Sequence, residues 1–507
     1  MSKKNKTVSL LQALRPKELE RFEVFLQSPF FGYSENVLRT YQCMVVDYPT
    51  FHKGFRKQDL YFRLFPEQAE KGTLSEQEDK TVRYLLSDLN KALQHFVLYQ
   101  RVFTTKPQQQ FELGQAFSDR GLIDQLPSVI QSVRKNAQKS SQIDPEYYYE
   151  RFRVSEIAFH YLMATQNRGQ NNGLQHVIDQ LDNYYLAAQL RYYCAAVNRE
   201  NILKVKYSYP MMAALFHHIE TQDYTNEPYI LIYFQVLQML QNPEGKVHYH
   251  ETKRLMTDHQ SVLSDEERKQ IYWFMINFCS ATIKEGDLDF LQERHQLYSS
   301  TLEDGIWHIG PYLHSSQFIL IVQNALALGL NDWTNRFIET YVKELNPKMR
   351  SSLKNLGLAY WHFAQADFES AHNHWIQIDS PEDFFFGLYY RVLILKIFFE
   401  KSMDEGLDSY EGAMVNALES LRFYLSPTRN QNMSETNRKS YSNFVKMTRR
   451  LLRIRYSWID KQPKKSIQRL LKDLQDTPFL EERKWLLSKA EHFRNLDLRK
   501  LKKGKHN

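Results

Sequence analysis

Histidine is the residue type in this chain with the clearest potential for chemistry, because its imidazole ring binds metals and transfers protons near neutral pH. Metal ligands that share one face of a helix lie three or four residues apart, whereas residues one or two apart point in different directions. The local groups have only the shorter spacings: His217-His218, His248 with His250, and His372 with His374. The spacing therefore predicts no metal site at these histidines.

Glu156 and His160 are four residues apart and do share a helical face. Since no second pair of ligands accompanies them, a surface ion pair explains them better than a metal site. The chain also lacks a Gly-rich phosphate loop, a His-Glu-x-x-His motif, a Cys-x-x-Cys pair and a Gly-x-Ser-x-Gly motif. We expect no catalytic residue, no metal and no cofactor. An enzyme would need polar side chains that converge from distant segments.

Positive charge is concentrated at the end of the chain. Residues 438–507 contain 21 Lys and Arg against 7 Asp and Glu, a net charge of +14, while the whole chain carries +7 and the remainder therefore −7. Four arginines fall on one predicted helix, and a second basic run, RKLKKGK, occupies residues 499–505: the arginines are Arg449, Arg450, Arg453 and Arg455. Such a region attracts phosphate backbones, anionic membranes or acidic proteins in a salt-dependent way.

Two explanations of the basic region stay open. A polar, solvated cap is required where a helical array ends, and clustered Lys and Arg are common at chain ends. We favour this cap over anion binding through the four arginines. A second nucleic-acid candidate is the succession of short helices over 55–102, which loosely resembles a helix-turn-helix with Arg83, Lys91 and Arg101. Acidic residues on the same segment oppose phosphate, so a structural or partner-docking domain is favoured there.

The elements that would position these side chains are helices. Only 17 Gly and 16 Pro occur in 507 residues, which favours long helices with short loops over a turn-rich β or α/β fold. Aromatic residues make up 14% of the chain and suit the spaces between stacked helices. We predict an all-α fold with four segments: an N-terminal helical domain (1–106), degenerate hairpins (107–263), repeats (264–430) and a basic cap (431–507).

The repeats are clearest where a small or acidic turn is followed by a bulky apolar residue. The segment 353–378 predicts two short helices that turn at Asp367, and similar turns at Gly286 and Gly329 recur within the period of about 35 to 45 residues typical of two-helix repeats. Ser264 comes just before a predicted helix, and Glu267 follows it three residues later. This spacing predicts a reciprocal capping box.

These hairpins resemble tetratricopeptide-type repeats. Leu358, Ala359, Phe363, Phe368 and Ala371 fall close to that family's small and large positions, while Ala366 replaces the usual turn glycine and Trp375 replaces a smaller aromatic. The whole chain also resembles a group of uncharacterised bacterial proteins of similar size, through ELERFEVFLQSPFF, DLYFRLFP and RYLLSDLNKAL. Both resemblances imply an α-solenoid with a scaffold role and bring no catalytic residues.

From these observations we expect a non-enzymatic protein-interaction scaffold whose concave face receives a peptide or a partner helix. Tyr360 and His362 are the predicted exposed contact positions, whereas Trp361 is better explained by packing between repeats. The alternative is a nucleic-acid-associated regulatory protein that uses the basic C-terminal region. The oligomeric state is left open.

The expected compartment is the cytoplasm. The start of the chain has lysines but no apolar stretch of signal-peptide length. Cys43, Cys194 and Cys279 each lie in an apolar helical pattern, as buried thiols in a reducing compartment do. The apolar run 384–399 carries Arg391 and Lys396 at its centre, so a buried helix is expected there and not a membrane span.

Overall fold

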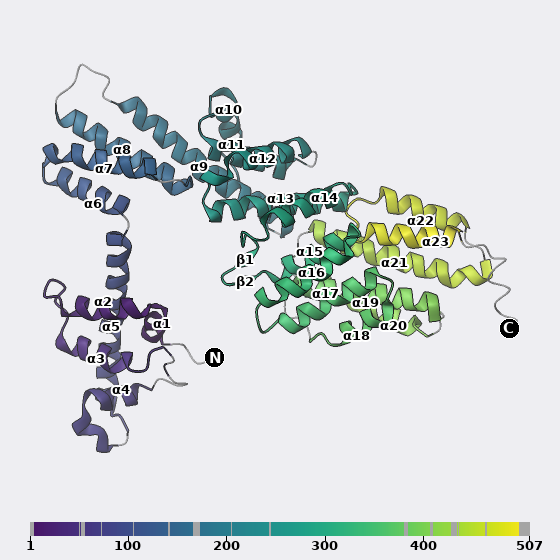
Figure 1. Cartoon of the computed structure of the whole chain (residues 1–507), viewed down its shortest axis with the longest axis horizontal. Helices are drawn as coiled ribbons and strands as arrows, with labels where there is room; N and C mark the ends of the chain where they lie inside the picture. Colours follow the sequence, from purple (N-terminus) through teal and green to yellow (C-terminus); the bar gives the residue numbers. More distant parts are fainter. Residues whose placement is uncertain are drawn as a thin grey trace. The chain divides into compact units, whose positions relative to one another are not determined.

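The structure is a computed structural model of the chain, and it is almost entirely helical (Figure 1). It describes residues 5–49, 51, 56–71, 73–104, 106–139, 142–165, 173–203, 205–242, 245–379, 384–405, 409–426, 433, 435–461 and 464–495. Within these residues there are 23 α-helices, α1–α23, and one two-stranded hairpin. The all-α prediction is therefore confirmed. The basic run at 499–505 lies outside the described residues.

The chain divides into two compact units, and the division falls inside two helices. One unit holds Met1–Lys139 with Arg153–Val177, and the other holds Ser140–Phe152 with Ile178–Asn507. The helices that the boundary crosses are α8 (Pro145–Ala164) and α9 (Leu174–Ile202). The two units are defined by contacts, whereas the four segments expected from the sequence were defined by changes in sequence pattern. The four segments therefore stay a prediction.

The first unit is built around α5, whose length gives the shorter helices a common surface. Its other helices are α1 (Lys6–Ala13), α2 (Pro16–Gln27), α3 (Glu35–Val45), α4 (Lys57–Leu64), α6 (Lys106–Asp119) and α7 (Leu126–Lys139), with α5 at Glu76–Thr104. Phe22 of α2 packs edge-on against Tyr41 of α3, with the ring centres 5.0 Å apart, and its ring is tilted against Phe96 of α5 at 5.2 Å. Aromatic side chains therefore hold these three helices together.

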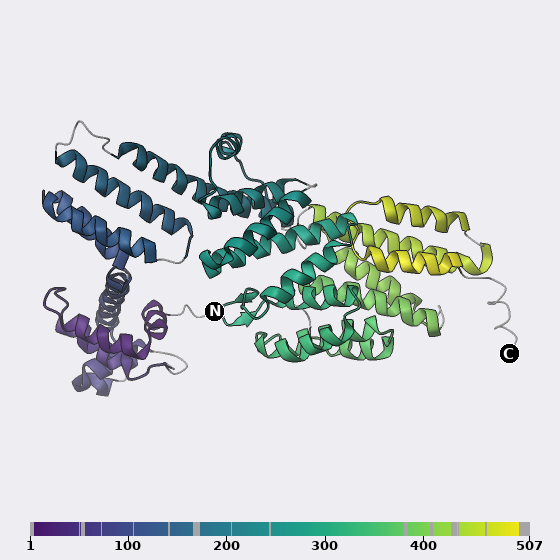
Figure 2. The same ribbon diagram turned by 45° about the horizontal axis from the view of Figure 1, so that its top comes forward.

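The second unit contains the remaining helices, most of which pack against the next helix in the chain. They are α10 (Met212–Thr221), α11 (Pro228–Gln241), α12 (Lys246–His259), α13 (Asp265–Glu285), α14 (Phe290–Thr301), α15 (Ser315–Ala327), α16 (Asn331–Tyr341), α17 (Arg350–Ala364), α18 (Phe368–Ile376), α19 (Phe384–Glu405), α20 (Glu411–Tyr424), α21 (Glu435–Lys461), α22 (Lys464–Asp476) and α23 (Arg483–Asn495). Figures 1 and 2 show α15–α20 side by side, and within this group α15 contacts α17 and α17 contacts α19.

Several short elements connect the helices. β1 (His308–Ile309) and β2 (Tyr312–Leu313) form an antiparallel hairpin that the sequence pattern did not predict, because each strand has only two residues. Its turn contains Gly310 with φ +60°, a conformation that glycine adopts easily. Four 3₁₀ helices complete the described structure: η1 (Pro66–Lys71), η2 (Ile123–Gln125), η3 (Gln260–Val262) and η4 (Val342–Glu344).

Three successive hairpins share one kind of turn. After α13, α15 and α17 the chain passes through a residue with positive φ: Gly286 (φ +120°), Gly329 (φ +77°) and Ala366 (φ +60°). In each case the next amide donates a hydrogen bond to a carbonyl five residues earlier, as in Asp367 N to His362 O at 3.1 Å. This pattern is a Schellman motif, and it reverses the chain between the two helices of each pair.

The start of α13 differs from its predicted capping box in one respect. The Ser264 hydroxyl accepts a hydrogen bond from the Glu267 amide at 3.3 Å, as predicted. The Glu267 carboxylate, however, lies in the core, where Tyr229 donates to it at 3.1 Å and Arg191 forms an ion pair at 3.0 Å. The prediction of a reciprocal capping box was wrong, because these distant partners compete for the carboxylate and outweigh one backbone amide.

In the part of the chain that the structure describes, none of the helices has the length and apolar character needed to span a bilayer. The charged residue Lys396 in the apolar helix α19 is buried and forms an ion pair with Glu482 at 2.8 Å. A buried charge is tolerated when a partner of opposite sign accompanies it. Lys396 therefore helps to fix α19 against the segment before α23.

Candidate binding groove

A groove lies between α14 and α16, the second helices of two successive hairpins. Its cavity measures about 210 Å³. The residues that line it come from the end of α14, the residues just after it, and one face of α16: Ser299, Leu302, Glu303, Trp333, Arg336, Phe337, Thr340 and Tyr341. The cavity is smaller than the roughly 300 to 1,000 Å³ of typical small-molecule sites and suits one or two side chains of a peptide.

One wall of the groove is an aromatic stack along α16. Trp333, Phe337 and Tyr341 are four residues apart, so they share a helical face. The rings of Trp333 and Phe337 are 5.4 Å apart and nearly parallel at 6°, and Phe337 and Tyr341 are 5.1 Å apart at 26°. Phe337 is buried, while Trp333 and Tyr341 are half-buried. Phe337 thus fixes the stack to the core, while the rings of Trp333 and Tyr341 stay partly open.

The α14 side fixes the orientation of Trp333. The His295 ring meets the Trp333 ring edge-on at 4.8 Å. Burial lowers the pKa of His295, so its imidazole stays neutral at neutral pH and supports the indole as a nonpolar surface. Rigid, partly open aromatic surfaces of this kind are typical of partner-binding hot spots.

Two opposite charges lie at the groove. Arg336 and Glu303 are both exposed. Burial, followed by the charges of Glu344 and Glu303, raises the pKa of Tyr341, and Glu303 and Tyr341 line the same groove. Within the described residues Arg336 has no ion pair, so its guanidinium is available to a carboxylate from outside. The groove therefore offers aromatic surfaces, one cation and one anion.

The contact positions predicted on α17 are used inside the protein. Tyr360 is 5% exposed, and its hydroxyl donates to the Tyr389 carbonyl at 3.0 Å. The prediction that Tyr360 is exposed was wrong, because α19 covers this face of α17. His362 Nδ1 pairs with Asp367 at 3.0 Å, and its ring stacks on His374 at 5.3 Å. His362 thereby joins α17 to α18.

Trp361 lies beside these residues and packs as predicted between neighbouring repeats. Its indole nitrogen donates to the Asn331 carbonyl at the start of α16, 3.0 Å away. The side chain is half-buried against the main apolar core of the second unit. Trp361 therefore links two hairpins.

The four arginines of α21 differ in what they contact. Arg449 forms an ion pair with Glu419 of α20 at 2.5 Å, and Arg450 with Asp473 of α22 at 2.7 Å. Arg455 donates to the Phe399 carbonyl at 3.5 Å and also to Ser402, near the end of α19. Because the last carbonyls of a helix lack intrahelical donors, Arg455 caps α19.

Arg453 is the one exposed residue of these four. Burial lowers the pKa of the Arg455 guanidinium, which lies 5.5 Å from the centre of the Phe399 ring. The predicted set of four anion-binding arginines is thus divided by the structure into three side chains with partners inside the protein and one that faces solvent. Two of the four arginines, Arg449 and Arg450, therefore form ion pairs with the neighbouring helices α20 and α22.

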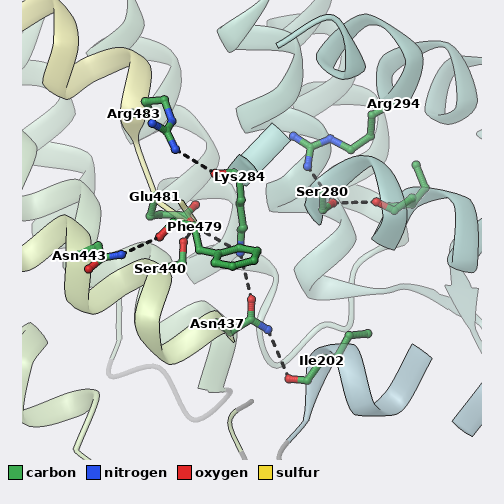
Figure 3. A network of polar contacts seen from close by, with 11 residues as sticks. Ile202, Ser280, Lys284, Arg294, Asn437, Ser440, Asn443, Phe479, Glu481 and Arg483 are labelled. Carbon is green, nitrogen blue, oxygen red and sulfur yellow. Dashed lines mark hydrogen bonds and ion pairs between the residues drawn. The ribbon is translucent and has the colours of Figure 1, made fainter. Parts of the chain in front are cut away.

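A polar network joins the C-terminal helices to α13, and the sequence pattern did not reveal it (Figure 3). Lys284, near the end of α13, forms an ion pair with Glu481 at 3.3 Å and donates to Asn437 of α21 at 3.2 Å. The Lys284 carbonyl accepts from Arg483 of α23 at 3.3 Å, and Asn437 donates to the Ile202 carbonyl at 3.3 Å. These contacts bring together residues far apart in sequence and have a structural role.

Within the described residues, no group of three or more His, Cys, Asp or Glu side chains is arranged to hold a metal ion. His372 contacts Trp375 and Phe398, while His374 pairs with Asn355 at 3.1 Å. The chain matches no protein-family profile, no curated protein and no solved structure.

Proposed function

We propose that this chain is a non-enzymatic scaffold for protein–protein interaction, built as an α-solenoid of tetratricopeptide-like hairpins. The observation that carries the proposal is the groove between α14 and α16, with its partly open aromatic stack and the exposed Arg336. The free cysteines Cys43, Cys194 and Cys279 support a cytoplasmic location.

The repeated turns support the solenoid arrangement. Schellman motifs after α13, α15 and α17 reverse the chain in the same way in three consecutive hairpins. Contacts between α15 and α17, and between α17 and α19, then stack first helices on first helices. Such stacking lets each hairpin bury a face that it cannot bury alone, which is the principle of helical-repeat proteins.

The expected occupant of the groove is a short peptide segment of a partner protein. An apolar side chain would stack on Trp333 and Tyr341, while a neighbouring carboxylate would pair with Arg336. A charge-assisted hydrogen bond to arginine beside aromatic contacts gives both affinity and orientation. The contacts of Arg449, Arg450 and Arg455 inside the protein favour this proposal over nucleic-acid binding through those side chains.

Site-specific photo-crosslinking in cells tests the proposal. A photoreactive amino acid replaces Thr340, an exposed position that lines the groove, and a matched control places it at Glu411, an exposed position of α20. We expect a distinct protein adduct from position 340 that disappears when Trp333→Ala is added, and no such adduct from position 411. An adduct that survives Trp333→Ala, or none at position 340, would contradict the proposal.

A further inference from the structure

Helices α21 and α22 contact each other in the second unit (Figure 1). Each carries a row of exposed basic side chains at helical spacing, seven residues apart on α21 and four and three residues apart on α22. In the part of the chain that the structure describes, none of these side chains has an ion pair or a hydrogen bond. We call them the basic face: Lys439, Lys446 and Arg453 of α21, and Lys465, Arg469 and Lys472 of α22.

An ion pair between the two helices shows that their basic rows lie on the same side. Arg450 of α21 pairs with Asp473 of α22 at 2.7 Å, and the two side chains are 30% and 47% exposed, so the pair lies at the solvent side of the helix contact. Arg450 follows Lys446 by four residues, and Asp473 follows Arg469 by four residues. Each member of the pair therefore shares a helical face with a basic neighbour, and the two rows flank the pair.

The basic face is elongated and strongly positive. Lys439 and Arg453 are fourteen residues apart, which corresponds to about 21 Å along α21. Because packed helices lie about 8 to 10 Å apart, α22 supplies a second row of charges beside the first. The exposed carboxylates on the described parts of both helices are Glu435 and Asp476, so six exposed basic side chains against two acidic ones leave a net charge of +4.

The composition of the face distinguishes among anionic partners. Among the described side chains of α21 and α22, no large apolar residue is exposed. Single-stranded nucleic acid is held by stacking on exposed aromatic rings, peripheral membrane helices insert an apolar face, and protein partners bind at aromatic or apolar hot spots. The phosphates of a duplex, by contrast, are bound by positive charge alone.

We propose that the basic face binds the phosphate backbone of a nucleic-acid duplex, independently of its sequence. A duplex carries one negative charge per about 1.7 Å of its axis, so the length of about 21 Å along α21 corresponds to about 12 phosphates. Lysine and arginine side chains that contact these phosphates release the cations condensed on them, and this release drives binding. Arg453 is the one member that the face shares with the four arginines considered above.

Fluorescence anisotropy of labelled oligonucleotides with the full chain tests the proposal over a range of salt concentrations. The probes are a DNA duplex of about 20 base pairs, which is longer than the face, the matched RNA duplex and the DNA single strand. Each phosphate contact adds about 0.9 to the slope of the logarithm of DNA affinity against the logarithm of salt concentration. We expect Lys446→Ala/Arg453→Ala to lower this slope by about 2 and to weaken DNA binding at least about tenfold at 0.1 M salt.

The matched control is Lys343→Ala/Lys348→Ala, which removes two exposed lysines of the same unit outside α21 and α22 and should leave the slope unchanged. The basic run at 499–505 is present in every variant, so the change in slope reports on the face. Circular dichroism checks that each variant stays helical. The two duplexes distinguish DNA from RNA as the source of the phosphates.

Three results would overturn the proposal. They are the absence of binding to either duplex at low salt, an equal slope for wild type and Lys446→Ala/Arg453→Ala, and tighter binding of the single strand than of the duplex. Vesicles that contain phosphatidylserine are tested in parallel, and binding to them without binding to a duplex would assign the face to a membrane surface instead. The face shares no residue with the α14–α16 groove, so either proposal can fail alone.

Discussion

The α15–α16 and α17–α18 hairpins share a turn and differ in what they leave open. Both reverse the chain through a residue of positive φ, Gly329 in one and Ala366 in the other. In α16, Trp333 and Tyr341 keep partly open ring surfaces at the groove. In α18, Trp375 stacks on Tyr390 of α19 at 4.3 Å and donates from its indole nitrogen to the Tyr390 carbonyl.

The difference between the hairpins comes from their neighbours and not from the hairpins themselves. Helix α19 packs against α17 and α18, buries Tyr360 and gives the half-buried Trp375 a stacking partner, whereas the groove beside α14 is open at Trp333 and Tyr341. Similar sequence patterns therefore produce a packing surface in one hairpin and a partly open aromatic surface in the other. Substitutions in the two hairpins should consequently separate loss of stability from loss of binding.

The largest expected loss of stability comes from substituting Tyr360, which lies in the α17–α18 hairpin. Tyr360→Ala removes a buried ring and the hydrogen bond to the Tyr389 carbonyl, and should lower the free energy of unfolding by about 3 to 5 kcal/mol. Trp333→Ala removes a half-buried ring and should cost about half as much while abolishing partner binding. Guanidinium unfolding followed by circular dichroism measures both. Equal losses would contradict the distinction between the hairpins.

The next largest difference in stability is expected between substitutions of two arginines of α21, Arg455 and Arg453. Arg455→Ala removes the donor to the Ser402 carbonyl in the last turn of α19 and should cost about 2 to 3 kcal/mol of stability. Arg453→Ala changes an exposed side chain and should stay within about 0.5 kcal/mol of wild type. Thermal unfolding of both variants is the measurement. A large loss from Arg453→Ala would show that α21 has contacts we have not assigned.

Asp367, which begins α18, should make the covered hairpin sensitive to acid. Hydrogen bonds from Ser370, and more weakly the neighbouring His362, lower the pKa of Asp367. Because the folded-state pKa is below the unfolded one, this stabilisation is complete above the unfolded pKa of about 3.9 and is lost as pH falls through the folded pKa. Asp367→Ala should cost about 1 kcal/mol at pH 7 and nothing at the lowest pH. Unfolding curves at several pH values check this; a pH-independent cost would contradict it.

The smallest effect concerns the turns. Ala366 has φ +60°, a conformation that disfavours any residue with a Cβ, so Ala366→Gly should raise stability by about 0.5 to 1 kcal/mol. Gly329→Ala is the converse control, because a Cβ there meets nothing within 4 Å and only the backbone conformation is penalised. It should lower stability by about 1 kcal/mol. Effects of the same sign in the two variants would refute the equivalence of the turns.

Local pattern predicted most of the helices and little of the surface. Pro16 at the start of α2, the Ser264 cap and the Gly286 end are encoded within a few residues, so they could be found in the sequence. The burial of Tyr360 depends on α19, and the ion pair of Arg450 depends on Asp473 of another helix. Contacts between distant segments decide which side chains stay exposed, and a single sequence does not specify them.

The groove shows the same limit. The spacing of Trp333, Phe337 and Tyr341 was visible in the sequence as one apolar helical face, which predicts burial as readily as binding. Only the position of α14 shows that two of the rings stay partly open.

The most direct test of the central claim compares photo-crosslinking from the two hairpins in the same cells. The photoreactive residue is placed at Thr340 in the groove or at His362 in the covered hairpin, and the adducts are identified by mass spectrometry. We predict a specific protein adduct from position 340, lost with Trp333→Ala, and none from position 362. A specific adduct from position 362 without one from position 340 would show that the partner binds at the α17–α18 hairpin and not at the groove.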